Sequence, residues 1–153
     1  MGTGDGLLRW AREDEVAVLE DVQREASLIW TEYRADLLAH PEAIMVPRRQ
    51  VRSPGIRVHE LDGAVTGFAA VLPLPDGEAE LDGLFVRPAH MRHGIGARLV
   101  ADVVGRARDG GAPRMVVTAN PRVETFYIRC GFRTIGEAPT RFGPAIRMDR
   151  DLT

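Results

Sequence analysis

The sequence contains no lysine, and all 20 of its basic residues are arginine. Enzymes that form a Schiff base or use pyridoxal phosphate need a lysine amine, and phosphate-loop NTPases need a lysine in their nucleotide motif. The missing lysine therefore excludes these classes. Serine is nearly as scarce, because only Ser27 and Ser53 occur and neither lies in the G-x-S-x-G motif of the α/β-hydrolases.

Cysteine and long apolar runs are also rare. Cys130 is the single cysteine, so the chain can form neither an internal disulfide nor a zinc site made of several cysteines. The most apolar stretch, Val65 to Leu74, is interrupted by Gly67 and Pro73 and is too short to span a bilayer. Met1 to Gly6 shows neither the basic nor the apolar part of a secretory signal. We therefore expect a cytoplasmic protein without membrane contact.

The charge and length set further limits. A formal net charge of -2 provides no field that would hold a polyanion, so nucleic acid is not an expected partner. With 44% hydrophobic and 27% charged residues, the composition is that of a globular protein. A chain of 153 residues fits one domain, 1–153, and no repeat or linker marks a second.

The first third of the chain is predicted to be mainly helical. A short strand at residues 7–10 precedes apolar residues that recur between Leu19 and Leu37 at spacings of three and four, which is the period of one helical face. Asp14 is expected to cap this helical segment. Two prolines then end it, and residues 48–55 are expected to form an exposed loop.

The remainder is predicted to alternate between strands and helices. Turn signals at Asp62-Gly63 and Pro75-Asp76-Gly77 divide an antiparallel meander. Ile95, Leu99 and Val103 lie four apart and give the next segment an apolar helical face. The expected fold class is α/β, with a mixed sheet of about seven mostly antiparallel strands, helices on both faces, and the order β-α-α-β-β-β-α-β-α-β-β. The expected segments are strands at 56–61, 65–74, 79–86, 115–119, 134–137 and 145–152, and helices at 94–108 and 121–130.

The most informative segment lies where a predicted strand ends at Val86 and a helix begins. There Gly94 and Gly96 let the backbone approach a ligand closely. The first N–H groups of a helix lack partners within the helix, and the helix dipole favours an anion there. The positive charges of Arg92, His93 and Arg98 add to this effect. The segment predicts a cradle for a phosphate group.

Two other interpretations of this segment compete with a phosphate cradle. A glycine-rich turn can cap a helix and bind nothing. A dinucleotide-binding fold needs G-x-G-x-x-G, but the third glycine position is Leu99, and the next strand ends at Asn120 instead of an acidic residue. The spacing of His90 and His93 suits a metal pair, but no third ligand lies nearby in the sequence, so no metal is expected.

A second motif follows the next predicted strand. Asn120 is a good N-cap, Pro121 suits the first helical position, and Gly131 suits the position after the helix. Between them lie Phe126 and Tyr127, which taken alone are typical of a core. In combination, a strand, a Gly-x-Gly helix start, a strand, an asparagine and Phe-Tyr-x-x-x-Gly-Phe resemble the GNAT superfamily of acyl-CoA-dependent N-acyltransferases. The resemblance covers nearly the whole chain.

The resemblance implies acetyl-CoA as co-substrate and a primary amine of a small molecule or peptide as acceptor. The family's pyrophosphate loop reads Arg/Gln-x-x-Gly-x-Gly/Ala; Gly94 and Gly96 match it, whereas Met91 stands at the Arg/Gln position and Arg92 would supply the charge. Backbone groups of residues 84–86 are implied to pair with pantetheine. The residues expected at the co-substrate are Leu84, Phe85, Val86, Arg92, His93, Gly94, Ile95, Gly96, Ala97, Asn120 and Tyr127.

The catalytic residues implied by the resemblance are Tyr127 and Glu80. Aminolysis of a thioester needs a neutral amine, a polarised carbonyl and a protonated leaving sulfur. Tyr127 matches the tyrosine that protonates the thiolate, and the N–H of Leu84 is expected to donate to the thioester oxygen. Glu80 and Asp82 face the same side of their strand, and Glu80 stands where some members carry a base. A solvated strand face or an arginine partner is the competing interpretation of both carboxylates.

Three functional interpretations stay open, because a fold does not fix a function. The first is an N-acetyltransferase. The second is a non-catalytic acyl-CoA-binding or sensor module, which would keep the phosphate cradle without needing Tyr127. The third is an acyltransferase that uses a longer acyl-CoA or a hydroxyl acceptor. The sequence also leaves a homodimer open as an assembly.

Overall fold

The computed structural model describes residues 6–140 and 143–153, with the side chains of residues 32 and 33 set aside. Its strands are β1 (Leu7–Trp10), β2 (Ile56–Leu61), β3 (Ala64–Pro73), β4 (Ala79–Val86), β5 (Arg114–Ala119), β6 (Arg133–Thr140) and β7 (Gly143–Asp151). Its α-helices are α1 (Val16–Leu28), α2 (Thr31–Ala39), α3 (Arg48–Arg52), α4 (Ile95–Asp109) and α5 (Glu124–Arg129). Short 3₁₀ helices are η2 (Glu13–Glu15), η3 (Pro41–Ala43), η4 (Pro88–His90) and η5 (Pro121–Val123).

The predicted mixed sheet is confirmed. Its strand order is β1-β2-β3-β4-β5-β7-β6. The pair β4–β5 is parallel, as its helical connection α4 requires, whereas β1–β2, β2–β3, β5–β7 and β6–β7 are antiparallel. Two compact units make up the chain. The first is Met1–Ala70 with Gly83–Leu99, and the second is Val71–Asp82 with Val100–Thr153.

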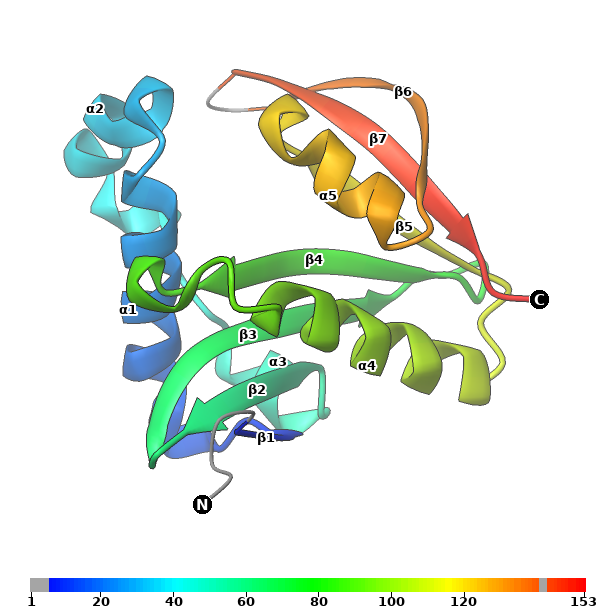
Figure 1. The fold of residues 1–153 in the computed structure, drawn as a ribbon, viewed down its shortest axis with the longest axis horizontal. Helices are drawn as coiled ribbons and strands as arrows, with labels where there is room; N and C mark the ends of the chain where they lie inside the picture. The colour runs from blue at the N-terminus through cyan, green and yellow to red at the C-terminus, as the bar shows by residue number, and fades with distance from the viewer. Residues whose placement is uncertain (1–5, 141–142) are drawn as a thin grey trace. The chain divides into compact units, whose positions relative to one another are not determined.

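The first unit has a core between α1 and the strands β2 and β3. Leu19 and Val22 of α1 are fully buried at helical spacing and belong to one apolar cluster with Phe68 of β3. Figure 1 shows β2 and β3 side by side. Asp62 and Gly63 connect these strands with φ values of 52° and 83°, the left-handed pair that a tight hairpin turn needs. The predicted Asp-Gly turn is therefore confirmed.

Two local predictions in this unit are wrong. Asp14 does not cap α1, because it lies inside η2. The N-cap of α1 is Glu15, whose side chain instead accepts a hydrogen bond from the Arg12 N–H at 2.8 Å at the start of η2. Residues 48–55 are not wholly an exposed loop. They include α3, which buries Gln50 and Val51, the latter in the core of the unit. A helix of five residues is too short to show a helical period in the sequence.

The second unit places α5 after β5. Figure 1 shows α5 alongside β7. Met115, Val117 and Met148 are buried on these strands, and Gly131 follows α5 with a φ of 93°, as predicted for a helix end. The fully buried Asp149 of β7 forms ion pairs with Arg114 at 2.6 Å and with Arg133 at 3.0 Å, tying three strands together. Among the described helices, none is long and apolar enough to cross a membrane.

Candidate active site

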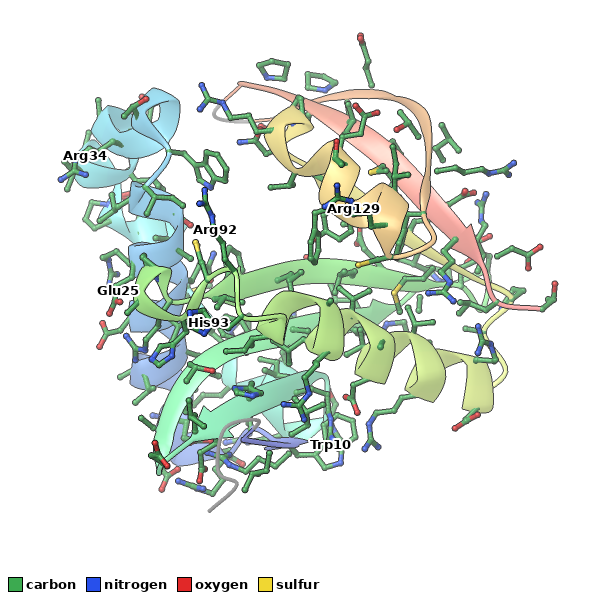
Figure 2. All side chains as sticks on the ribbon, viewed as in Figure 1. Trp10, Glu25, Arg34, Arg92, His93 and Arg129 are labelled. Carbon is green, nitrogen blue, oxygen red and sulfur yellow. The ribbon has the colours of Figure 1, made fainter. Side chains whose placement is uncertain are left out.

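The predicted phosphate cradle lies in the first unit, in the loop between β4 and α4 (residues 87–94). Arg87 anchors its beginning: its N–H donates to the Thr66 carbonyl at 2.8 Å, its Nε donates to the Val65 carbonyl at 2.8 Å, and its guanidinium forms an ion pair with Glu25 of α1. Figure 2 shows Glu25 on α1 and both Arg92 and His93 on the loop. The loop is thus fastened at its start to β3 and α1.

Two residues at the end of the loop have left-handed backbone. Arg92 and Gly94 both have left-handed backbone, with φ values of 66° and 80°. The Gly94 carbonyl accepts the N–H of Arg98 at 3.0 Å, which starts α4 and leaves the preceding first-turn N–H groups without acceptors inside the helix. Apart from chain neighbours, no described atom lies within 4 Å of the position that a Cβ on Gly94 would take. The space beside this backbone is open.

Two exposed polar side chains border this loop. Arg92 and His93 are exposed and form no hydrogen bond or ion pair with the residues that the structure describes. Arg98, the third residue expected to add positive charge, contacts Nε2 of the buried His59 at 3.2 Å. A guanidinium can only donate, so Nε2 accepts and Nδ1 of His59 donates to Thr66 Oγ1 at 2.6 Å. Arg98 therefore ties the first turn of α4 to β2 and β3.

The end of β4 is held closely against β3 within the same unit. The rings of Phe85 and Phe68 are 5.4 Å apart. A Cβ on Gly67 would lie 2.8 Å from the Phe85 carbonyl oxygen and 3.2 Å from Val86 Cγ2, so only glycine permits this approach. Leu84, Phe85 and Val86 are all half-buried. The strand that is expected to carry pantetheine is therefore fixed by packing.

The second unit holds Asn120, Tyr127 and Glu80. The Asn120 Oδ1 accepts the Arg122 N–H at 2.8 Å, as predicted for an N-cap. Its Nδ2 is buried and has no hydrogen-bond partner in the described part of the chain. A buried donor without a partner typically costs about 1–3 kcal/mol, so this atom fits contact with a ligand carbonyl.

Tyr127 sits in an aromatic cluster. Its ring is edge-on to Phe126 at 5.1 Å and to Phe132 at 5.6 Å, and the residue is 6% exposed. Burial, with a smaller contribution from Cys130, raises the pKa of Tyr127 well above its usual range. A tyrosine hydroxyl with its ordinary pKa of about 10 is already protonated at neutral pH, and the upward shift extends the protonated range.

Glu80 has an arginine partner. Its Oε2 lies 3.2 Å from Arg147 Nη1 of β7, and the same nitrogen donates to Thr118 Oγ1 of β5 at 2.6 Å. Asp82 is exposed. Arg147 and Thr118 were absent from the predicted site. Their distance from Glu80 in sequence left no local signal, and only the strand pairing brings them together.

The predicted site residues thus belong to both units. Among residues 6–140 and 143–153, no group of three or more His, Cys, Asp or Glu side chains could hold a metal ion. The first unit contains Leu84, Phe85, Val86, Arg92, His93, Gly94, Ile95, Gly96 and Ala97, and the second contains Glu80, Asn120 and Tyr127.

Comparison with known proteins agrees with the resemblance. An uncharacterised N-acetyltransferase of Mycobacterium bovis is 33% identical over 85 residues, which cover 54% of this chain and 54% of that protein. The chain thus matches about half the length of this relative. An amino-acid acetyltransferase of Ralstonia nicotianae is 32% identical over 135 residues, covering 86% of this chain and 28% of that protein.

Solved structures agree with the fold. A Salmonella typhimurium protein solved with acetyl-CoA has a TM-score of 0.70 and 25% identity, covering 96% of this chain and 94% of that chain. The sequence model of the acetyltransferase (GNAT) family matches residues 15–132, well over half of the protein. The chain therefore belongs to the GNAT acetyltransferase family.

Proposed function

We propose that this protein transfers an acetyl group from acetyl-CoA to a primary amine of a small molecule or a peptide. The observation that carries the proposal is the start of α4. Left-handed backbone at Arg92 and Gly94, open space beside Gly94 and first-turn N–H groups without acceptors inside the helix support a pyrophosphate site there. Family membership supports acetyl-CoA as the molecule that carries it.

Groups of this chain can be assigned to each part of acetyl-CoA. The N–H groups of residues 95–97, the charge of Arg92 and the imidazole of His93 would hold the pyrophosphate. The backbone of residues 84–86 and the unpaired Nδ2 of Asn120 would hold the pantetheine amides. When bound, acetyl-CoA supplies a reactive thioester and a thiol leaving group.

Proton movements are assigned to Glu80 and Tyr127. An alkylammonium acceptor loses two protons in total as its nitrogen gains a bond to the acetyl carbon and that carbon loses its bond to sulfur. Glu80 accepts a proton from the amine and passes it to water. Tyr127 donates its proton to the leaving sulfur. The second amine proton is lost to solvent, and solvent returns one proton to the Tyr127 phenolate, so that one proton is released overall.

A binding module without catalysis would need the same cradle but not the two proton-transferring side chains. The ion pair between Glu80 and Arg147 is the observation that favours this second candidate, because it gives Glu80 a role that needs no acceptor. A transferase that uses a longer acyl-CoA would share all of these residues.

Binding and turnover separate the candidates. Acetyl-CoA should raise the melting temperature, and dephospho-CoA should do nearly as well if the pyrophosphate dominates binding. Release of the CoA thiol should then be measured with amino acids, diamines, amino sugars and short peptides; amino acids belong in the panel because of the Ralstonia relative's name. Propionyl-CoA and butyryl-CoA test the donor. Absence of a thermal shift at millimolar acetyl-CoA would contradict the proposal, and binding without release with any acceptor would favour the module.

A further inference from the structure

The guanidinium of Arg147 uses only one of its nitrogens inside the protein. Nη1 donates to Glu80 Oε2 at 3.2 Å and to Thr118 Oγ1 at 2.6 Å, so both of its hydrogens are engaged. Nε and Nη2 form no hydrogen bond with any residue that the structure describes. These two nitrogens form the edge of the guanidinium that binds a carboxylate through two parallel hydrogen bonds.

The pair is held in place yet accessible. Arg147 lies directly opposite Thr118 in the β5–β7 register, and Glu80 lies opposite Val116, two residues earlier on β5. The Arg147 side chain is 34% exposed and that of Glu80 is 25% exposed. Thr118 fixes the position of the guanidinium, so little conformational entropy remains to be lost when a ligand binds its free edge.

The neighbouring charges do not occupy that edge. Asp149, two residues along β7, faces the same side of the strand as Arg147 but is taken by Arg114 and Arg133. Glu80 is left with its second oxygen, Oε1, unpaired within the described residues. A free cationic edge and a free anionic oxygen thus lie next to each other, joined by the contact at 3.2 Å.

We propose that Arg147 and Glu80 together recognise a zwitterionic acceptor, an α-amino acid or another amine whose carboxylate lies a few bonds from its nitrogen. The carboxylate binds the Nε–Nη2 edge of Arg147, and the ammonium binds Glu80, the group assigned above to take its proton. This inference rests on the proposed acetyl transfer. It selects small amino acids over peptide N-termini, whose nearest carbonyl is an amide and carries no charge.

A dianionic ligand such as a phosphate monoester fits less well. It would satisfy the Arg147 edge but would place a second negative charge close to Glu80, and two like charges in a partly buried site repel. A zwitterion satisfies both members of the pair. The adjacent charges therefore favour an acceptor that carries both signs.

The first test compares acceptors on the parent protein. An α-amino acid, its amide, its methyl ester and the corresponding decarboxylated amine are assayed for CoA release, with rates compared at equal total acceptor concentration. The kcat/KM for the amino acid should exceed that for the other three by about 10- to 100-fold, the range expected for a charge-assisted pair. Equal kcat/KM values would overturn the inference and leave the proposed function standing.

The second test uses Arg147→Gln, which removes the charge. A companion variant, Arg147→Lys, keeps the positive charge but lacks the two-nitrogen edge of the guanidinium. In Arg147→Gln the preference for the amino acid should disappear, mainly through KM, so that the ratio of kcat/KM for the amino acid to kcat/KM for the decarboxylated amine falls towards one. Arg147→Lys should recover only part of the loss. The matched control is Arg106→Gln, which should behave as the parent. Arg106 is an exposed arginine of α4 that is paired with Asp102. An equal loss for all acceptors in Arg147→Gln would contradict acceptor recognition.

A direct binding measurement distinguishes this inference from the function on which it rests. Calorimetry with the amino acid in the presence of CoA should show binding that Arg147→Gln weakens about 10-fold or more. If the amino acid binds but no acceptor releases CoA from acetyl-CoA, the proposed transfer fails and zwitterion recognition survives. If acetyl transfer occurs but the amino acid binds no better than its decarboxylated amine, only the inference fails. If Arg147→Gln does not fold, Arg147→Lys and the parent's acceptor preference still decide it.

Discussion

Gly94 and Gly63 share one backbone state in two different places. Their φ values are 80° and 83°, and for both no described atom outside the glycine and its chain neighbours lies within 4 Å of the place that a Cβ would take. Gly63 turns the chain between β2 and β3, whereas Gly94 precedes α4. Matched substitutions at the two glycines can therefore distinguish the cost of backbone strain from the loss of a ligand site.

Gly94→Ala and Gly63→Ala should each lower the free energy of unfolding by about 1 kcal/mol, because a side chain disfavours left-handed backbone. Only Gly94→Ala should also weaken the binding of acetyl-CoA. Relief of the backbone strain would change the conformation of the loop, and a methyl group would fill the open space. Chemical denaturation and titration calorimetry measure the two effects. Equal affinity for acetyl-CoA in both variants would argue that the pyrophosphate binds elsewhere.

Tyr127→Phe should reduce kcat by about 100-fold, the low end for loss of an acid catalyst, because a CoA thiolate is already a fair leaving group. The affinity for acetyl-CoA should stay unchanged, since the ring contacts with Phe126 and Phe132 remain. Phe126→Leu alters the same cluster without touching the hydroxyl and serves as the packing control. Parent-like turnover in Tyr127→Phe would mean that the proton comes from another donor.

The raised pKa of Tyr127 also predicts a dependence of stability on pH. The unfolded chain loses this phenolic proton near the ordinary tyrosine value of about 10, whereas the folded chain retains it to higher pH. The folded state then binds more protons than the unfolded state, so the free energy of unfolding falls as pH rises above about 10. Denaturant titrations between pH 8 and about 11 should show this fall in the parent and a smaller one in Tyr127→Phe. Identical slopes would show that burial of this hydroxyl does not couple to folding.

Glu80→Gln should lower turnover mainly at low pH, with partial recovery as the free amine becomes abundant at higher pH. Asp82→Asn changes a carboxylate two residues away on the same strand and should have a much smaller effect. A pH profile of kcat/KM with the decarboxylated amine separates proton transfer from recognition of a carboxylate. A uniform loss at every pH would indicate that Glu80 only orders Arg147.

The sequence predicted the elements whose signals are local. β4 begins and ends where the alternating pattern and the turns placed it, and α4 differs by one residue at each end. β6 is longer than predicted, Arg133–Thr140, because it pairs with β7 through residues such as Gly136 and Pro139 that have low strand propensity. Pairing with a neighbour overrides local preference there.

The candidate site was predictable only in part. Gly94 and Asn120 follow from capping and turn chemistry, which depend on neighbouring residues. The Arg147–Glu80 contact depends on the register of β4, β5 and β7, and residues 67 positions apart in the sequence carry no mutual signal. The same reason explains Arg98, whose contact with His59 requires α4 to be placed against β2.

Arg92 shares its positive φ with only one other non-glycine residue among those described, Asp62. Aspartate tolerates this backbone state better than arginine does. A mutant library screened only for thermal stability should therefore enrich Arg92→Gly. A library selected for acetyl transfer should keep the arginine. Opposite enrichment at one codon would reveal that evolution has retained a charge in this loop against the preference of the backbone.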